Sequence, residues 1–304
     1  MAGVITSTSF AKALFPGVSS WYGNKYDEFE VECKDLFEVQ SSRRAYEEDV
    51  GTSGFGLAQE KAEGQAIAYD DATQAFVSRY SHTVFALGFV ITREMVEDDL
   101  YDVIGKRKSE ALAFSMRQTK ENVCANVYNR AFNSSYTGGD GVSLLNSAHP
   151  NFAGGTQSNV LAVAADLSEA SLEQASIDIQ KWTDDRGLRI NYRPQTLHIP
   201  VDLEFEAERI LKTQFRVGTT NNDINALNNM GKIPGGVKIN HYFTDTDAWF
   251  LRTNCPDSMK LYERRGAEFT IDNDFDTENA KYKATERYVP GWTDYRGLFG
   301  TAGA

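Results

Sequence analysis

Acidic side chains between residues 184 and 208 stand close enough together to suggest general acid–base catalysis, which positioned carboxyl groups can perform. They are Asp184, Asp185, Asp202, Glu204, Glu206 and Glu208. The last three occupy positions i, i+2 and i+4 on the polar side of a helix predicted over residues 202–211. Carboxylates on an exposed helix are usually solvated and inert. An α/β enzyme that uses them is therefore an alternative that the pattern does not favour.

A second acidic run imitates the first ligands of a calcium-binding EF-hand loop: Asp272, Asp274 and Asp276. Such a loop needs Gly at its sixth position and Glu at its twelfth. This chain has Thr277 and Lys283 at those positions. An acidic hairpin with solvated carboxylates fits better, so the sequence predicts neither a metal ion nor any other cofactor.

Histidine and cysteine residues are dispersed along the chain. The four histidines lie outside any His-Glu-x-x-His motif: His82, His149, His198 and His241. The three cysteines form no Cys-x-x-Cys pair, which indicates buried thiols in a reducing compartment: Cys33, Cys124 and Cys255. His198 falls inside a predicted strand and is expected to be structural. Phosphate-loop, dinucleotide and nucleophile-elbow motifs are missing from the sequence, so it predicts no catalytic residue and no enzyme.

The chain is acidic, with a net charge of −12 and a pI near 4.9. This charge argues against direct binding of nucleic acid or of an anionic membrane, because both require clustered positive charge. Residues 1–10 have no basic segment followed by an apolar run, so no signal peptide is expected. The longest apolar stretch, Val84 to Ile91, is far shorter than the roughly 18 residues of a membrane span. We therefore expect assembly in the cytoplasm.

The elements that would position any site are a long helix and an α/β unit. A helix is predicted over 106–132, because apolar side chains recur on one face: Leu112, Met116, Val123, Val127 and Ala131. Its ~27 residues would span ~40 Å and form a spine. Alternating strand and helix signals from about 168 to 252 predict an α/β layer, with a strand at 196–199 and a helix after Pro200. The overall class is α+β.

The N-terminal quarter reads differently. Residues 1–40 predict an arm that cannot form its own core, with single aromatics that include Trp21 and Tyr22. Residues 41–80 predict a long β-hairpin with a flexible tip. Its dense charges are either a solvated surface or a contact with an adjacent subunit: Arg43, Arg44, Glu47, Glu48 and Asp49.

This order of elements resembles the Hong Kong 97-type fold of tailed-bacteriophage major capsid proteins. Local sequence adds to the likeness over roughly residues 80–300. Pro194–Leu203, in which a strand ends in proline before a helix, is similar to a segment of Mu-type major head subunits. Leu144–Pro150 and Val237–Ile239 resemble a histidine-containing loop and a later strand of the same proteins.

The resemblance implies a structural role: self-assembly as hexamers and pentamers into an icosahedral shell that encloses double-stranded DNA in the virion. It also implies domains, namely an N-terminal arm (1–40), an extended loop over a neighbouring subunit (41–80), a peripheral domain (81–134 and 262–304, with the spine helix 106–132) and an axial domain (135–261).

The resemblance further implies partners. A portal and a separate scaffolding protein are expected, and decoration proteins are possible. The scaffolding protein is expected to be separate, because the arm begins at once and leaves no room for a long scaffolding segment. No covalent crosslink is predicted, since Lys61 is the only lysine in 41–80 and has no evident partner. An encapsulin-type cargo compartment shares this fold and remains an alternative.

Overall fold

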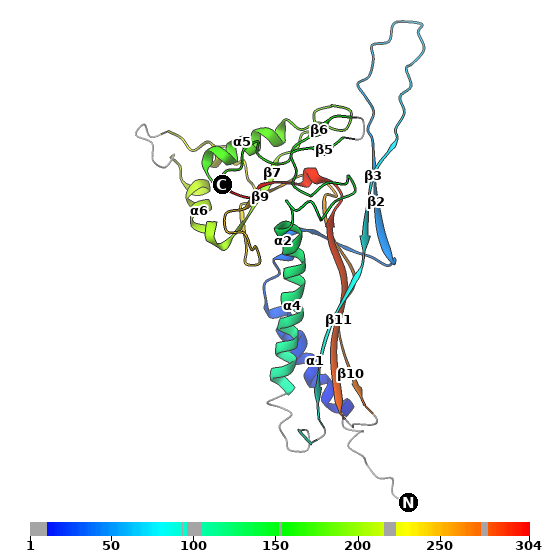
Figure 1. Cartoon of the computed structure of the whole chain (residues 1–304), viewed down its shortest axis with the longest axis vertical. Helices are drawn as coiled ribbons and strands as arrows, with labels where there is room; N and C mark the ends of the chain where they lie inside the picture. Colours follow the sequence, from blue (N-terminus) through cyan, green and yellow to red (C-terminus); the bar gives the residue numbers. More distant parts are fainter. Residues whose placement is uncertain (1–10, 93, 96–104, 152–153, 216–222, 275–278) are drawn as a thin grey trace, which may run out of the picture.

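The computed structural model describes residues 11–92, 94–95, 105–151, 154–215, 223–274 and 279–304. The molecule is elongated, with a long helix and a long β-ribbon side by side and a second layered unit at one end (Figure 1). Two four-stranded sheets carry the fold. In the described part of the chain, no helix is both long and apolar enough to cross a bilayer.

The first sheet joins segments that are far apart in the sequence. Its strand order is β1 (Glu38–Ser41), β10 (Met259–Asn273), β11 (Ala280–Trp292) and β4 (Thr83–Ile91). β1 runs parallel to β10, and the other two pairs are antiparallel. β4 contains the apolar stretch from Val84 to Ile91. It forms one edge of the sheet.

The spine helix α4 (Lys106–Asn129) lies against this sheet. Its buried face carries the predicted Leu112 and Met116 together with Cys124 and Tyr128. The helix prediction is confirmed, but the helix ends three residues before the predicted 132. Arg130 leaves helical geometry at φ −103° and ψ 7°, and the chain then turns back toward the second sheet.

The N-terminal segment packs against the rest of the chain. α1 (Ala11–Glu28) packs along α4, and Tyr22 is only 4% exposed, stacked on Phe269 with ring centroids 5.0 Å apart. Leu36 and Phe37 are buried in the main core. Residues 1–40 were predicted to be unable to form a core by themselves, and Tyr22, Leu36 and Phe37 are instead buried in cores that the rest of the chain builds. Tyr22 and Tyr26 stand one helical turn apart, which gives α1 an aromatic stripe.

The second sheet confirms the predicted α/β unit. Its strands, in spatial order, are β12 (Leu298–Thr301), β9 (Trp249–Thr253), β7 (Pro194–Pro200) and β8 (Val237–Asn240). Two helices pack with it through the buried residues of one core: α5 (Glu169–Gln180) and α6 (Glu204–Lys212). β12 belongs to this sheet. The predicted assignment of all of 262–304 to a peripheral unit is therefore wrong at its end, because β12 pairs with β9.

β9 connects the two main hydrophobic cores. Successive strand residues point to opposite faces, so Phe250 enters the core around Tyr128, whereas Trp249 and Leu251 enter the core around Ile179. The two layered units are consequently packed through a shared strand and not only tethered by loops.

A hairpin projects from this body. β2 (Tyr46–Thr52) pairs antiparallel with β3 (Gln74–Ser81), and the loop between them extends beyond every other part of the molecule (Figure 1). The predicted hairpin is confirmed. The described residues also form six short elements: α2 (Cys33–Leu36), β5 (His149–Pro150), β6 (Thr156–Gln157), α7 (Ala226–Asn229) and the 3-10 turns Val201–Leu203 and Tyr295–Gly297.

Candidate functional site

The foot of the hairpin is anchored on the first sheet by Asp49. Its carboxylate accepts hydrogen bonds from Lys260 Nζ at 2.7 Å, Thr293 Oγ1 at 2.6 Å and Tyr262 OH at 3.2 Å. Burial would raise the pKa of Asp49, but the hydrogen bonds from Lys260 and Thr293 outweigh this effect and hold the pKa below its usual value. Asp49 therefore fixes the direction of the hairpin.

The structure gathers the other predicted contact charges at the same foot. Glu47 accepts a hydrogen bond from Ser42 at 2.7 Å and lies 3.7 Å from the Arg44 guanidinium. Glu48 lies 3.7 Å from Arg79. These charges are thus partnered within the chain. Arg43, in contrast, is exposed and has no carboxylate within 4.0 Å among the described residues.

The two aromatic contact candidates lie elsewhere, on α1. Tyr22 is buried within its own chain, and burial raises its pKa above the usual value. Trp21 is half-buried against the Ile91 and Tyr282 cluster at the edge of the first sheet. Tyr22 is already covered in this conformation, so a contact between this pair and a neighbour stays a prediction.

Sequence reasoning missed the apolar side chains of the projecting loop. Phe55 is 61% exposed, Leu57 81%, Ile67 65% and Tyr69 94%. Single exposed apolar residues are normal on a surface, but four on one projecting loop indicate a contact surface. The signal was present in the sequence, where these residues interrupt an otherwise polar stretch.

The base of this loop is held in place. Asp70 accepts a hydrogen bond from the Gly56 backbone N–H at 2.7 Å and lies 3.5 Å from Arg186. Arg186 also donates to the Asp71 carbonyl at 2.7 Å. The turn that contains Arg186 belongs to the unit built on the second sheet, so that unit and the first sheet both position the hairpin.

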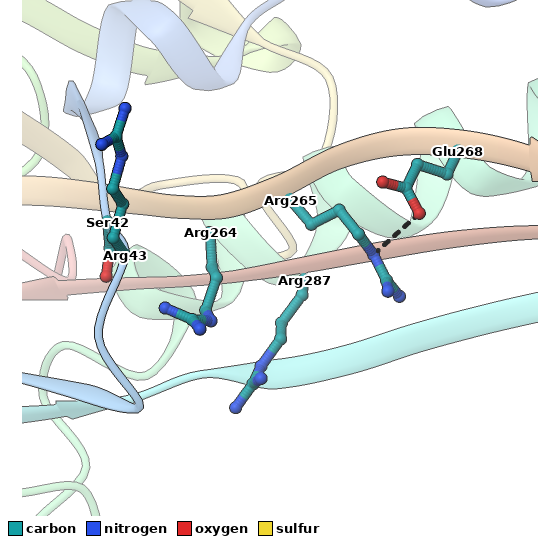
Figure 2. Close-up of a pocket in the computed structure, with 6 residues that line it drawn as sticks. All are labelled: Ser42, Arg43, Arg264, Arg265, Glu268 and Arg287. Carbon is teal, nitrogen blue, oxygen red and sulfur yellow. Dashed lines mark ion pairs between the residues drawn. The ribbon is translucent and has the colours of Figure 1, made fainter.

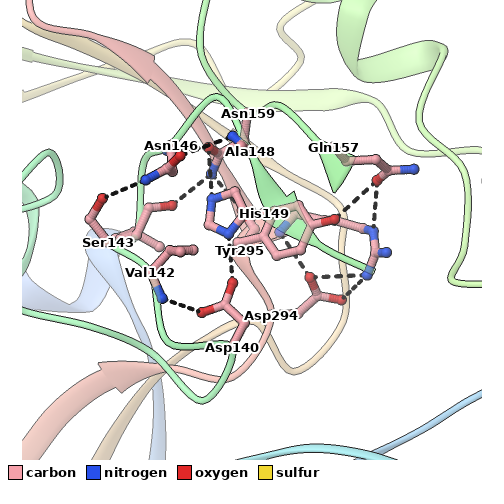
Figure 3. A network of polar contacts seen from close by, with 12 residues as sticks. Asp140, Val142, Ser143, Asn146, Ala148, His149, Gln157, Asn159, Asp294 and Tyr295 are labelled. Carbon is pink, nitrogen blue, oxygen red and sulfur yellow. Dashed lines mark hydrogen bonds and ion pairs between the residues drawn. The ribbon is translucent and has the colours of Figure 1, made fainter. Parts of the chain in front are cut away.

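A buried network joins the loops after α4 to the segment before β12 (Figure 3). His149 Nδ1 lies 2.6 Å from Asp140, Nε2 lies 3.1 Å from Asn159 Oδ1, and the ring stacks on Tyr295 at 3.8 Å. Asn159 also donates to the Leu298 carbonyl at 3.1 Å. The histidine–aspartate pair resembles a catalytic dyad, but His149 is fully buried with both nitrogens occupied. It acts as a structural joint.

The carboxylates considered for catalysis are not brought together. Asp184 accepts from the backbone of its own turn, and Asp185 lies 2.9 Å from Arg296. Glu206 and Glu208 pair with basic residues of their own helix. Asp202 and Glu204 lie at the start of that helix. In the described residues, no group of three or more His, Cys, Asp or Glu side chains is arranged to hold a metal ion.

Solved structures with the same fold come from shells and phages. The virus-like particle from Pyrococcus furiosus is 8% identical with a TM-score of 0.54, over 94% of this chain and 98% of that chain. The bacteriophage JBD30 procapsid is 13% identical with a TM-score of 0.54, over 96% and 75%. A Mycobacterium phage Che8 structure is 11% identical with a TM-score of 0.55, over 90% and 93%. These likenesses show the fold.

The Hong Kong 97-type fold that the order of elements predicted is therefore confirmed. Among curated proteins, none matches the sequence. A family profile described as phage capsid protein does match, over residues 76–300. This range includes the spine helix, most of β3 and the strands of both sheets, except β1. The chain belongs to the phage capsid protein family.

Proposed function

We propose that this capsid protein is the major subunit of an icosahedral shell, in which it assembles as hexamers and pentamers around double-stranded DNA. The observation that carries the proposal is the projecting hairpin, whose loop exposes four large apolar side chains that its own chain does not cover. The family match favours this role over an encapsulin-type cargo compartment.

The hairpin supports assembly energetically. A fully buried large apolar side chain contributes roughly 1.5–3 kcal/mol, so covering the loop on a neighbouring subunit favours association. A contact between different surfaces of identical chains closes into rings when the rotation allows it. Many such contacts in a closed lattice act together, so each can be modest.

We propose four domains, and the strand pairing of the two sheets supports this division. The peripheral domain comprises 81–134 and the chain from 262 through β11, whereas the axial domain comprises 135–261 with β12 added to its sheet. Residues 1–40 are the arm and 41–80 the extended loop. The axial domains would meet at the five-fold and six-fold axes.

The proposal also covers the location of the protein and its partners. The protein is a non-enzymatic component of the virion, assembled in the host cytoplasm with a portal, a separate scaffolding protein and possible decoration proteins as partners. Its net charge of −12 supports a wall that encloses DNA without binding it by sequence.

Negative-stain electron microscopy tests the proposal. The purified full chain, alone and co-expressed with its neighbouring genes, should form closed shells, tubes, sheets or capsomer rings. A variant in which residues 53–73 are replaced by an Asn-Gly turn should fold but fail to form closed shells. A monodisperse monomer or dimer of the full chain under every condition would overturn the proposal.

A further inference from the structure

The first sheet has one covered face and one open face. α1 and α4 pack on the covered face, where Glu286 is buried beside Lys120. Adjacent strand residues point to opposite faces, so Arg287 points to the open face. In the strand register, Arg265 pairs with Arg287, and Arg287 pairs with Val84. These three side chains form one row across the open face.

A hollow of about 460 Å³ lies on this face, and basic side chains dominate its lining. The lining residues are Ser42, Arg43, Arg264, Arg265, Glu268 and Arg287. Figure 2 shows the Arg264 and Arg287 side chains reaching the same way from neighbouring strands. We call Arg43, Arg264, Arg265 and Arg287 the arginine face.

The backbone of β10 explains why consecutive arginines line one hollow. The register skips a residue between Glu263 and Arg265, and again between Arg265 and Glu268. A β-bulge places two residues opposite one and re-aims a side chain. Arg264 is the extra residue of the first bulge, so it joins Arg265 where a regular strand would have turned it away.

The arginine face lacks compensating negative charge. Arg265 lies 3.4 Å from Glu268, but Arg43, Arg264 and Arg287 have no carboxylate within 4.0 Å in the described chain. Arg287 Nε is buried without a hydrogen-bond partner. Buried polar groups are nearly always satisfied. In a chain of net charge −12, this face is therefore an incomplete binding site for anions.

We propose that the arginine face binds the carboxylates at the hairpin tip of a second copy of this chain, chiefly Glu60 and Glu63; this rests on the proposed function. A guanidinium binds a carboxylate through two parallel hydrogen bonds, which suits this pairing. Both glutamates are exposed and have no partner in the described chain.

The hairpin cannot satisfy its own arginine face. Ser42 and Arg43 lie at its foot, whereas Glu60 and Glu63 lie near its tip. The ~17 residues between foot and tip span roughly 50 Å when extended. Apolar side chains are also available on both surfaces of this contact. Val84 and Val90 on β4 are 53% and 54% exposed, and Leu57 is exposed on the hairpin loop.

A charge swap tests the pairing. Shell yield should fall roughly tenfold or more in Arg264→Glu/Arg287→Glu and in Glu60→Arg/Glu63→Arg, because each places like charges together. Combining all four substitutions should restore shells. The control Lys34→Glu/Lys181→Glu makes the same net charge change as the arginine variant, at exposed lysines that have no ion pair in the described chain, and should assemble normally.

Circular dichroism and the unfolding midpoint show whether each variant folds. The tip variant keeps the test valid if the arginine variant misfolds, because Glu60 and Glu63 are exposed. Two outcomes overturn the inference alone: the wild type forms shells and neither double variant reduces their yield, or the fourfold variant fails to restore shells. A wild type that forms no shells overturns the proposed function. Loss of duplex-DNA binding with normal assembly would identify phosphate as the ligand and also overturn the inference.

Discussion

His149 connects two parts of the chain through both ring nitrogens, to Asp140 and Asn159. We expect His149→Phe to keep the stack on Tyr295 but to leave these polar partners unsatisfied. The free energy of unfolding should fall by about 1–3 kcal/mol, measured by urea denaturation. His241→Phe is the control, because His241 is an exposed partner of Glu32 and such pairs contribute little. Equal losses in both variants would contradict the structural role of His149.

His198 gives a pH prediction. Burial, with Arg252 and Lys238 nearby, lowers the pKa of His198 to about 3 in the folded chain. The unfolded imidazole binds a proton near pH 6.5. Stability is therefore complete above pH 6.5 and decreases as the pH falls toward 3, because only the unfolded state gains the proton.

The measurement compares urea midpoints of wild type and His198→Gln between pH 7 and 5. The wild type should lose about 2 kcal/mol more than the variant over this range. If the stability of wild type and of His198→Gln changed identically with pH, protonation of His198 could not be the cause of the loss.

Residue roles were predictable only where the local sequence determines them. His198 was expected to be structural from its place between two strand apolars, and it is fully buried. The arginine face was not predictable, because Arg43 lies more than 200 residues before its other three members, and all four meet only through strand register and a bulge. Asp49 looked like a subunit contact, because its partners Lys260 and Thr293 lie 211 and 244 residues away in the sequence.

Among the elements, those with strong periodicity were predictable. α4, β7 and the hairpin carry patterns long enough to specify their type. The core role of α1 and α2 was missed, because their few apolar residues become a stripe only against α4. β12 was misplaced for a related reason: four apolar or small residues do not reveal which sheet they join.

The hairpin loop offers a prediction that separates folding from assembly. Leu57→Ser/Tyr69→Ser should change the unfolding free energy by less than about 0.5 kcal/mol, because both side chains are exposed. Shell yield should nevertheless decrease, as judged by sucrose-gradient sedimentation. A control pair, Val163→Ser/Phe205→Ser, removes apolar groups that are 79% and 72% exposed elsewhere on the molecule. If both pairs reduce assembly alike, general surface hydrophobicity and not the loop is responsible.

For the whole molecule, the charge arrangement predicts salt sensitivity. An acidic chain whose basic face accepts carboxylates should associate less well when ions screen that attraction. The screening length shortens from roughly 8 Å at physiological salt to 3 Å at 1 M. Light scattering should therefore show slower and less complete assembly in 1 M sodium chloride. Faster assembly at high salt would mean that apolar burial alone controls association.

The order of strands in the first sheet also determines when, during its synthesis, the chain can assemble with other subunits. β4 finds its neighbour β11 about 190 residues later in the chain, which a ribosome takes roughly 10–40 s to translate. Arg265 and Arg287 emerge in that same late portion. A nascent chain thus holds a hairpin but no finished surface to receive one. We therefore expect polysomes carrying many such chains to be protected from premature polymerisation, with completion of translation as the trigger for assembly.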